Sequence, residues 1–232
     1  ASEGLGREVA KKIAAAGAKV VVSARSEDRL KSLVEEIGEN ASYVTVDVTD
    51  SAAVDAAAKQ IGHIDGVVYL AGVYWPMKAS EWDNEKADLM TEINYLGGSR
   101  VVGSVIVPMV DRDAGHIVLT GSLSGFRGLP GAIGYSASKA GLMALAESMQ
   151  ADLRKTGVRV QVINPGFIKT RLTEKNDFEM PFIMEPEDAA QVFFDHMDSG
   201  GFKRSFPTVF SWVFRLSQFM PDWMYYRLFG AK

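Results

Sequence analysis

Tyr135 and Lys139 have the types and the spacing needed for acid–base chemistry. Residues four apart on a helix lie on one face, so the phenol and the ammonium group would be neighbours. A free tyrosine has a pKa of about 10, which is too high for efficient proton transfer at neutral pH. A fixed ammonium group nearby favours the phenolate and lowers that pKa. The pair therefore predicts a general acid or base, although this spacing also arises often by chance.

A serine upstream strengthens this interpretation. Ser122 follows the apolar segment 116–120, which is typical of a buried strand. In open α/β sheets, ligands bind beyond the carboxyl ends of the strands. We therefore expect the Ser122 hydroxyl to face a bound molecule.

The first residues predict a second ligand-binding feature. Gly4 and Gly6 open a helix in which Leu5, Val9 and Ile13 recur every fourth residue. Glycines at a helix N-terminus let backbone N–H groups approach a pyrophosphate. A glycine-rich helix start without any ligand is an equally open alternative for so short a motif.

The strand predicted after this helix ends at a basic residue. In dinucleotide-binding folds an acid here binds the 2′-hydroxyl of the adenosine ribose, but this position is Arg25. A guanidinium group fits a 2′-phosphate, so Arg25 favours NADP(H). The alternative is a solvated arginine beside Glu27 and Asp28.

Helices and strands alternate along the first 200 residues. Helices are predicted at 5–16, 27–37, 51–61, 85–110, 136–155 and 186–197, and strands at 18–24, 43–46, 66–70, 116–120 and 158–163. Strands separated by helices of this length imply right-handed crossovers and a parallel sheet. We expect an α/β fold of the Rossmann type, a doubly wound sheet in three α/β/α layers.

With these motifs the sequence resembles the short-chain dehydrogenase/reductase family over about residues 1–200. The resemblance rests on Ala1-Ser2-Glu3-Gly4-Leu5-Gly6, Asp47-Val48, Leu70-Ala71-Gly72, Asn94, Ser122, Tyr135 with Lys139, and Asn164-Pro165-Gly166 with Thr170. It implies hydride transfer between NADP(H) and a carbonyl or alcohol substrate. The alternatives are an NAD(H)-preferring dehydrogenase of the same family and a non-catalytic nucleotide-binding regulatory protein.

The resemblance also implies residue roles. Tyr135 would protonate the carbonyl oxygen, and Lys139 would lower the tyrosine pKa and hold the nicotinamide ribose. Ser122 would orient the substrate oxygen, and Asn94 would anchor a water molecule in a proton relay. Besides Asn94, Tyr135 and Lys139, cofactor contacts are implied for Ser2, Gly4, Leu5, Gly6, Arg25, Asp47, Val48, Ala71, Gly72, Pro165, Gly166, Ile168 and Thr170.

The sequence departs from the family pattern in three places. The family motif opens with a strand and a Thr-Gly pair that would precede Ala1, so we expect this first strand to be missing from the printed sequence. Tyr69-Leu70 replaces two asparagines, so their strand-stabilising side chains are expected to be lost. Glu3 stands where some NADP-preferring members have a basic residue, which weakens the preference expected from Arg25.

Apolar residues predict a hydrophobic substrate. Residues 173–184 stand where the family has a mobile substrate lid, and the segment is rich in Phe, Met and Ile. Apolar pockets with few polar groups select hydrophobic ligands. The predicted substrate contacts, besides Ser122, are Tyr74, Trp75, Phe167 and Phe178.

Residues 201–232 form an aromatic C-terminal extension that is interrupted by Pro207 and Pro221. Three interpretations stay open for it. It caps the substrate pocket, it contacts a second subunit of a homo-oligomer (a dimer or tetramer), or it lies on a membrane surface. Arg215 and Arg227, beside aromatic residues, fit the last interpretation in outline.

Composition excludes several other classes. The chain has 232 residues, 47% hydrophobic and 23% charged, which is typical of one globular domain and not of a disordered chain. Its net charge of -4 argues against nucleic-acid binding. It has no cysteine, and His63, His116 and His196 are too far apart to suggest a metal site. Without an apolar run of about 18 residues or an opening signal peptide, we expect a cytoplasmic protein, with membrane association through the extension as the alternative.

Overall fold

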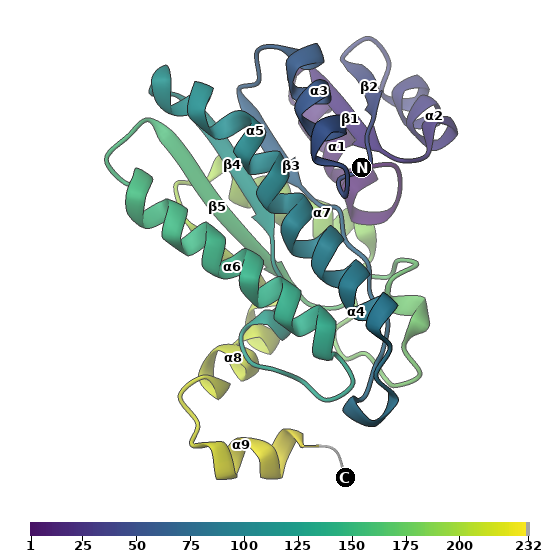
Figure 1. The fold of residues 1–232 in the computed structure, drawn as a ribbon, viewed down its shortest axis with the longest axis vertical. Helices are drawn as coiled ribbons and strands as arrows, with labels where there is room; N and C mark the ends of the chain where they lie inside the picture. Colours follow the sequence, from purple (N-terminus) through teal and green to yellow (C-terminus); the bar gives the residue numbers. More distant parts are fainter. Residues whose placement is uncertain (231–232) are drawn as a thin grey trace.

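Parallel β-strands form the centre of the molecule in the computed structural model, which describes residues 1–230 (Figure 1). The strands are β1 (Val20–Ala24), β2 (Ala41–Thr45), β3 (Gly66–Tyr69), β4 (Gly115–Thr120), β5 (Val158–Pro165) and β6 (Lys203–Phe206). β1 pairs with β2, and the others form a four-stranded sheet in the order β3-β4-β5-β6. All of these pairs are parallel. The predicted Rossmann-type topology is therefore confirmed.

The strands are connected by helices close to the predicted positions. These helices are α1 (Gly4–Ala15), α2 (Glu27–Ile37), α3 (Ser51–Ile61), α4 (Asn84–Thr91), α5 (Gly97–Asp111), α6 (Ile133–Leu153) and α7 (Pro186–Asp198). A π-helical turn, Glu92–Leu96, joins α4 to α5. Short 3-10 turns lie at Ala79–Glu81, Leu123–Gly125 and Thr173–Lys175.

Helices cover the four-stranded sheet on both faces. On one face, Val102 and Met109 of α5 pack with Leu119 of β4. On the other face, Val9 of α1 and Phe193 of α7 pack with Val118 and Ile163. Successive residues of a strand point to opposite faces, which is why the neighbours Val118 and Leu119 belong to different clusters. Figure 1 shows α5 and α6 in front of the sheet and α7 behind it.

The sheet continues past residue 200. β6 pairs with β5, and Phe206, opposite Pro165, is buried against α7. β6 thus lies beyond the boundary that the sequence analysis placed near residue 200. Lys203 and Arg204 open this strand, so it lacks the apolar run that identified the other strands.

The stretch from α4 to α5, Asn84–Asp111, is long and apolar enough to cross a membrane by length and composition alone. The sequence analysis did not find such a segment because it counted consecutive apolar residues. α5 buries Val102, Val105 and Met109 against the sheet. We therefore interpret this stretch as a core helix of the domain.

Two further helices, α8 (Thr208–Ser217) and α9 (Asp222–Phe229), follow the last strand. In Figure 1 they lie beyond one end of the sheet, far from the N-terminus. The extension is therefore helical, and it begins directly after β6.

Candidate active site

Ser122 lies just beyond the carboxyl end of β4. It precedes the 3-10 turn Leu123–Gly125, and its Oγ accepts hydrogen bonds from the backbone N–H (3.2 Å) and the hydroxyl (2.9 Å) of Ser124. Both serines are buried. The turn therefore fixes the Ser122 hydroxyl at the edge of the sheet where α/β folds bind ligands.

Tyr135 and Lys139 lie on successive turns of α6 and face the same edge of the sheet. The Lys139 side chain is only 4% exposed, and its Nζ donates a hydrogen bond of 2.9 Å to the carbonyl oxygen of Thr120, the last residue of β4. The same Nζ lies 5.8 Å from the centroid of the Tyr135 ring. The structure thus brings Ser122, Tyr135 and Lys139 together, as the sequence predicted.

Burial shifts both titratable groups toward their neutral forms. It raises the pKa of Tyr135 to about 12, although the side chain of Ser122 acts in the opposite direction. It lowers the pKa of Lys139 to about 8. The lowered tyrosine pKa expected from the sequence is therefore not found in this structure, in which the ammonium group is bound to Thr120. A neutral phenol is the form that can donate a proton to a carbonyl oxygen.

Asn94 lies in the π-helical turn and is fully buried. Its Oδ1 accepts from the backbone N–H of Val73 (2.8 Å), and its Nδ2 donates to the Val73 carbonyl (3.0 Å) and to Ser138 Oγ (3.0 Å). These bonds connect the segment after β3 to α6. The side-chain amide of Asn94 thus bonds Val73 and Ser138, and its role in anchoring a water molecule stays a prediction.

Gly72 lies close to the side chains of Asn94 and Lys139. A Cβ atom at this position would be 3.4 Å from Asn94 Oδ1 and 3.6 Å from Lys139 Nζ. A larger side chain would fill the space beside Lys139. The absence of a side chain at Gly72 leaves this space unfilled, and the cofactor contacts expected at Ala71 and Gly72 stay predictions.

Tyr69, which replaces a family asparagine, supplies a contact that the sequence analysis did not foresee. Its ring is buried, and its hydroxyl donates a hydrogen bond to the carbonyl oxygen of Ile93, the residue before Asn94. Burial raises the pKa of Tyr69 well above its ordinary value, so the hydroxyl stays protonated and can donate. The end of β3 is therefore connected directly to the turn that carries Asn94.

We predict that Tyr69→Phe lowers the free energy of unfolding by about 1–3 kcal/mol, because the buried Ile93 carbonyl loses a hydrogen-bond donor. Chemical denaturation of the variant measures this change. Tyr226→Phe is the control: Tyr226 is 65% exposed, and this variant should stay within about 0.5 kcal/mol of the wild type. Equal stabilities of the two variants would contradict the assigned contact.

The N-terminus of α1 is suited to an anionic ligand. Gly4 has a φ of +53°, and a Cβ atom there would lie 3.0 Å from Thr170 Cγ2. No side chain caps α1, and its first turn contains no acid, so its N–H groups are free to bind a phosphate. The carboxylate of Glu3 is instead paired with Arg29 and Arg171. The glycine turn and Thr170, distant in the sequence, thus lie side by side, and the pyrophosphate site expected there stays a prediction.

Arg25 and Asp47 face each other across the carboxyl ends of β1 and β2. The Arg25 Nη1 lies 3.9 Å from Asp47 Oδ2, and the Arg25 side chain is 68% exposed. Burial acts to raise the pKa of Asp47, but hydrogen bonds from Thr49 and the charge of Arg25 bring it below its ordinary value. The carboxylate is therefore ionised at neutral pH and can accept hydrogen bonds from an adenine amino group.

The remaining predicted cofactor residues lie after β2, at the end of β5 and just after it, and at the start of α1. Val48 contributes its carbonyl oxygen to a hydrogen bond with Arg100 (3.3 Å), and Pro165 is the last residue of β5. The Gly166 N–H donates to the Phe206 carbonyl (2.7 Å), and Ile168 is buried. Ser2, Leu5 and Gly6 flank Gly4 at the start of α1.

The predicted substrate residues form aromatic contacts beside this site. The Tyr74 ring meets the Tyr135 ring edge-on, with their centroids 5.1 Å apart. Lys175 lies 4.3 Å from the Trp75 ring centroid, which connects Trp75 to segment 173–184. The centroids of Phe167 and Phe178 are 5.9 Å apart.

Sequence reasoning missed Phe210 of α8. Its ring centroid lies 6.0 Å from that of Phe167 and 5.5 Å from that of Phe182. The only signal was the aromatic composition of the extension, which was interpreted as a possible cap on the pocket. These contacts connect α8 to segment 173–184.

The rest of the described structure was searched for a metal site and for other hollows. Within residues 1–230, no group of three or more His, Asp or Glu side chains could hold a metal ion. A surface hollow of about 300 Å³ lies between α3 and α5 and is lined by residues that include Asp55, Lys59 and Arg112. None of these three residues was predicted as a site residue.

Known proteins resemble this chain in sequence. The family model for short chain dehydrogenases matches residues 1–180. An uncharacterized oxidoreductase of Myxococcus xanthus is 38% identical over 229 residues, which covers 96% of this chain and 90% of the relative. The 3-oxoacyl-(acyl-carrier-protein) reductase FabG of Salmonella typhimurium is 32% identical over 182 residues, 75% of this chain and 72% of that protein.

A solved structure resembles most of this chain. The closed form of a serine dehydrogenase complexed with NADP+ superposes with a TM-score of 0.81 at 25% identity. The match covers 88% of this chain and 90% of that one.

Proposed function

This chain belongs to the short-chain dehydrogenase family and is an NAD(P)-dependent oxidoreductase, and we propose that it transfers a hydride between NADP(H) and a hydrophobic carbonyl or alcohol substrate. The observation that carries this proposal is the meeting of Ser122, Tyr135 and Lys139 at the carboxyl end of β4. Consumption of NADPH with a panel of hydrophobic ketones and aldehydes tests it directly.

In the proposed reduction, Tyr135 is the general acid. Its phenol donates a proton to the carbonyl oxygen, and the ammonium group of Lys139, 5.8 Å from the centroid of the Tyr135 ring, favours this transfer. The Ser122 hydroxyl donates a hydrogen bond to the same oxygen and orients it. The chemistry that a reduced nicotinamide would supply, when bound, is a hydride for the carbonyl carbon.

Lys139 has a positioning and electrostatic role in this proposal. Its buried Nζ, held by the Thr120 carbonyl, lies beside Gly72, where the ribose of a cofactor would pass. As the phenol loses its proton, the nearby cation stabilises the negative charge that develops on Tyr135. Asn94 keeps Val73 and Ser138 in place, and thereby the walls of the site.

The cofactor would lie along the carboxyl ends of the strands. The start of α1, residues 2–6, and Thr170 would hold the pyrophosphate, and Asp47 would bind the adenine. Residues 165–168 and Thr170 would line the nicotinamide. The related serine dehydrogenase was solved with NADP+, which supports a cofactor of this class.

We assign the preference for NADP(H) to Arg25. Arg25→Ala should weaken NADPH binding by about 10–100-fold, because charge-assisted hydrogen bonds to the 2′-phosphate are lost. NADH binding should change by less than about threefold. Fluorescence titration with both cofactors measures the two constants.

Arg154→Ala is the matched control, since Arg154 is an exposed residue at the end of α6. It should leave both dissociation constants unchanged. Equal weakening of NADH and NADPH by Arg25→Ala would instead favour an NAD(H)-preferring enzyme, in which Arg25 serves mainly as the ion-pair partner of Asp47.

The aromatic contacts support a hydrophobic substrate. Tyr74 adjoins Tyr135, and the ring of Phe167 contacts those of Phe178 and Phe210. Such a lining favours a ketone or alcohol with an apolar body.

A cytoplasmic homo-oligomer, either a dimer or a tetramer, remains part of the proposal. Val107 and Val110 of α5 are exposed, and they offer an apolar surface for a contact between copies. Sedimentation of the purified chain tests this assembly.

A further inference from the structure

Helix α8 is apolar on two faces. Phe210 and Phe214, four residues apart, have their ring centroids 5.0 Å from each other, and Phe210 also contacts Phe167 and Phe182. The other face carries side chains that are between 43% and 77% exposed, and these are Val209, Trp212, Val213 and Leu216. Their spacing of three and four residues places them on one stripe of the helix. An apolar stripe of this kind is normally covered by another surface.

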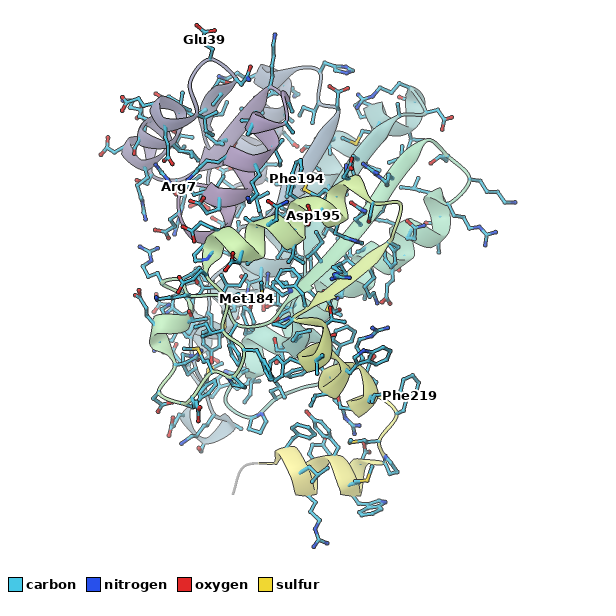
Figure 2. All side chains as sticks on the ribbon, turned by 180° about the vertical axis from the view of Figure 1, so that it is seen from behind. Arg7, Glu39, Met184, Phe194, Asp195 and Phe219 are labelled. Atoms are coloured by element: carbon cyan, nitrogen blue, oxygen red, sulfur yellow. The ribbon has the colours of Figure 1, made fainter. Side chains whose placement is uncertain are left out.

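The exposed apolar surface continues through the next turn and along α9. Phe219 is 85% exposed, and Figure 2 shows it at the corner between α8 and α9, directed away from the body. Trp223, Tyr226 and Leu228 of α9 are between 64% and 71% exposed. Together with the stripe on α8, these residues form what we call the outward surface.

The outward surface is held firmly by the catalytic domain. Arg127 donates to the carbonyl of Met220 (2.8 Å) and to Asp222 (2.6 Å), and its guanidinium lies 4.0 Å from the Tyr225 ring centroid. Tyr225 is buried, and its hydroxyl donates to the carbonyl of Gly128 (2.6 Å). The two helices are therefore fixed by their inner residues while the apolar residues around them face solvent.

Residues 204–230, which carry this surface, are basic, although the whole chain has a net charge of -4. Residues 204–230 contain Arg204, Arg215 and Arg227 but only one acid, Asp222, which is paired with Arg127. The Arg215 guanidinium lies 4.2 Å from the centroid of the Trp212 ring. Exposed tryptophans beside arginines suit the boundary between lipid headgroups and acyl chains.

We propose that the outward surface of α8 and α9 docks on an anionic lipid surface. Apolar side chains would enter the interface, while Arg215 and Arg227 would meet negative headgroups. A second copy of the chain fits less well, because a symmetric contact would place the same arginines against each other.

The docking surface is continuous with the substrate region. Phe210 contacts segment 173–184 from one face of α8, while Trp212 and Leu216 lie on the opposite, outward face. A carbonyl compound dissolved in the lipid would therefore have a short path to the site. This consequence, unlike the docking itself, rests on the proposed reductase function.

Co-sedimentation of the full chain with vesicles tests the docking without cofactor or turnover. We expect binding to vesicles of phosphatidylcholine with about 30% phosphatidylglycerol, and binding weaker by about tenfold to phosphatidylcholine alone. Leu216→Asp should weaken binding to the anionic vesicles by about tenfold or more. Ala52→Asp, at an exposed position of α3 outside both proposed contact surfaces, should leave it unchanged.

Circular dichroism first establishes that both variants are folded. Absence of wild-type binding to the anionic vesicles at low salt would overturn the proposal, as would equal losses in Leu216→Asp and Ala52→Asp. If the wild type instead forms dimers that Leu216→Asp dissociates, with no vesicle binding, then a second copy covers this surface and the lipid proposal is wrong. Since binding is measured without substrate, an inactive enzyme would leave this result unaffected.

Discussion

Replacing Tyr135 by phenylalanine is expected to lower kcat for carbonyl reduction by about 10²–10⁴-fold. The substitution removes only the hydroxyl group, so the ring can keep its edge-on contact with Tyr74. The loss follows because the carbonyl oxygen no longer receives a proton as the hydride arrives. Binding of NADPH should remain within about threefold of the wild type, since the glycine turn and Thr170 are untouched.

Tyr74→Phe is the matched control for this experiment. Tyr74 is also partly buried, its pKa is also raised by burial, and its ring adjoins the same site. Its hydroxyl has no proposed proton-transfer role, so kcat should fall by less than about tenfold. Steady-state kinetics of both variants, together with the dissociation constant for NADPH, separate proton transfer from binding. Wild-type turnover by Tyr135→Phe would remove Tyr135 from the mechanism.

Lys139→Met is expected to lower kcat by about 100-fold or more. Methionine is similar in length but carries no charge, so the charge that develops on the Tyr135 oxygen loses its nearby cation. The variant also loses the hydrogen bond from Nζ to the Thr120 carbonyl. If the role of Lys139 were only to fill this space, kcat would remain close to that of the wild type.

The same substitution should change how stability depends on pH. Burial lowers the pKa of Lys139 to about 8, whereas in the unfolded chain it is near its ordinary value of 10.5. Between these values the unfolded state binds the additional proton, so the wild-type free energy of unfolding should increase with pH. Relative to Lys139→Met, the increase from pH 8 to pH 10 should be about 2 kcal/mol. Denaturant titrations at the two pH values measure it, and parallel pH profiles would contradict a buried, charged lysine.

Most of the fold could be predicted because its signals are local. Gly17 follows the end of α1, Asp50 caps the start of α3, and the run Val20-Val21-Val22 lies in β1. β6 could not be recognised, because its basic first residues hide a strand whose buried end depends on pairing with β5. The pairing of two strands that are distant in the sequence cannot be predicted from the residue pattern of either strand alone.

The part of the candidate site that consists of sequence motifs in a fixed order could be predicted. Ser122, Tyr135 and Lys139 are brought together because a strand end and a helix start are adjacent in this fold. The contact between Tyr69 and Ile93 could not be foreseen, since it depends on a π-helical turn that no simple periodicity indicates. Burial raises the pKa of Tyr135 in this structure, an effect of the surrounding fold that the spacing of Tyr135 and Lys139 does not indicate.

The contacts of the C-terminal extension could not be predicted from its sequence either. Its aromatic composition was compatible with a pocket cap, a subunit contact or a membrane surface. Only the structure shows that Phe210 and Trp212, two residues apart, lie on different faces of α8, one against Phe167 and one exposed.

The measurement that tests the central claim most directly is transfer of deuterium from labelled cofactor to substrate. The full chain is incubated with NADPH deuterated at the transferred position and with a hydrophobic ketone, and the product is analysed by mass spectrometry. We expect an alcohol that carries one deuterium on its carbinol carbon, formed by the wild type and reduced by about 10²-fold or more with Tyr135→Phe. Binding of NADPH without any labelled alcohol, across a panel of ketones and aldehydes, would contradict the proposed hydride transfer.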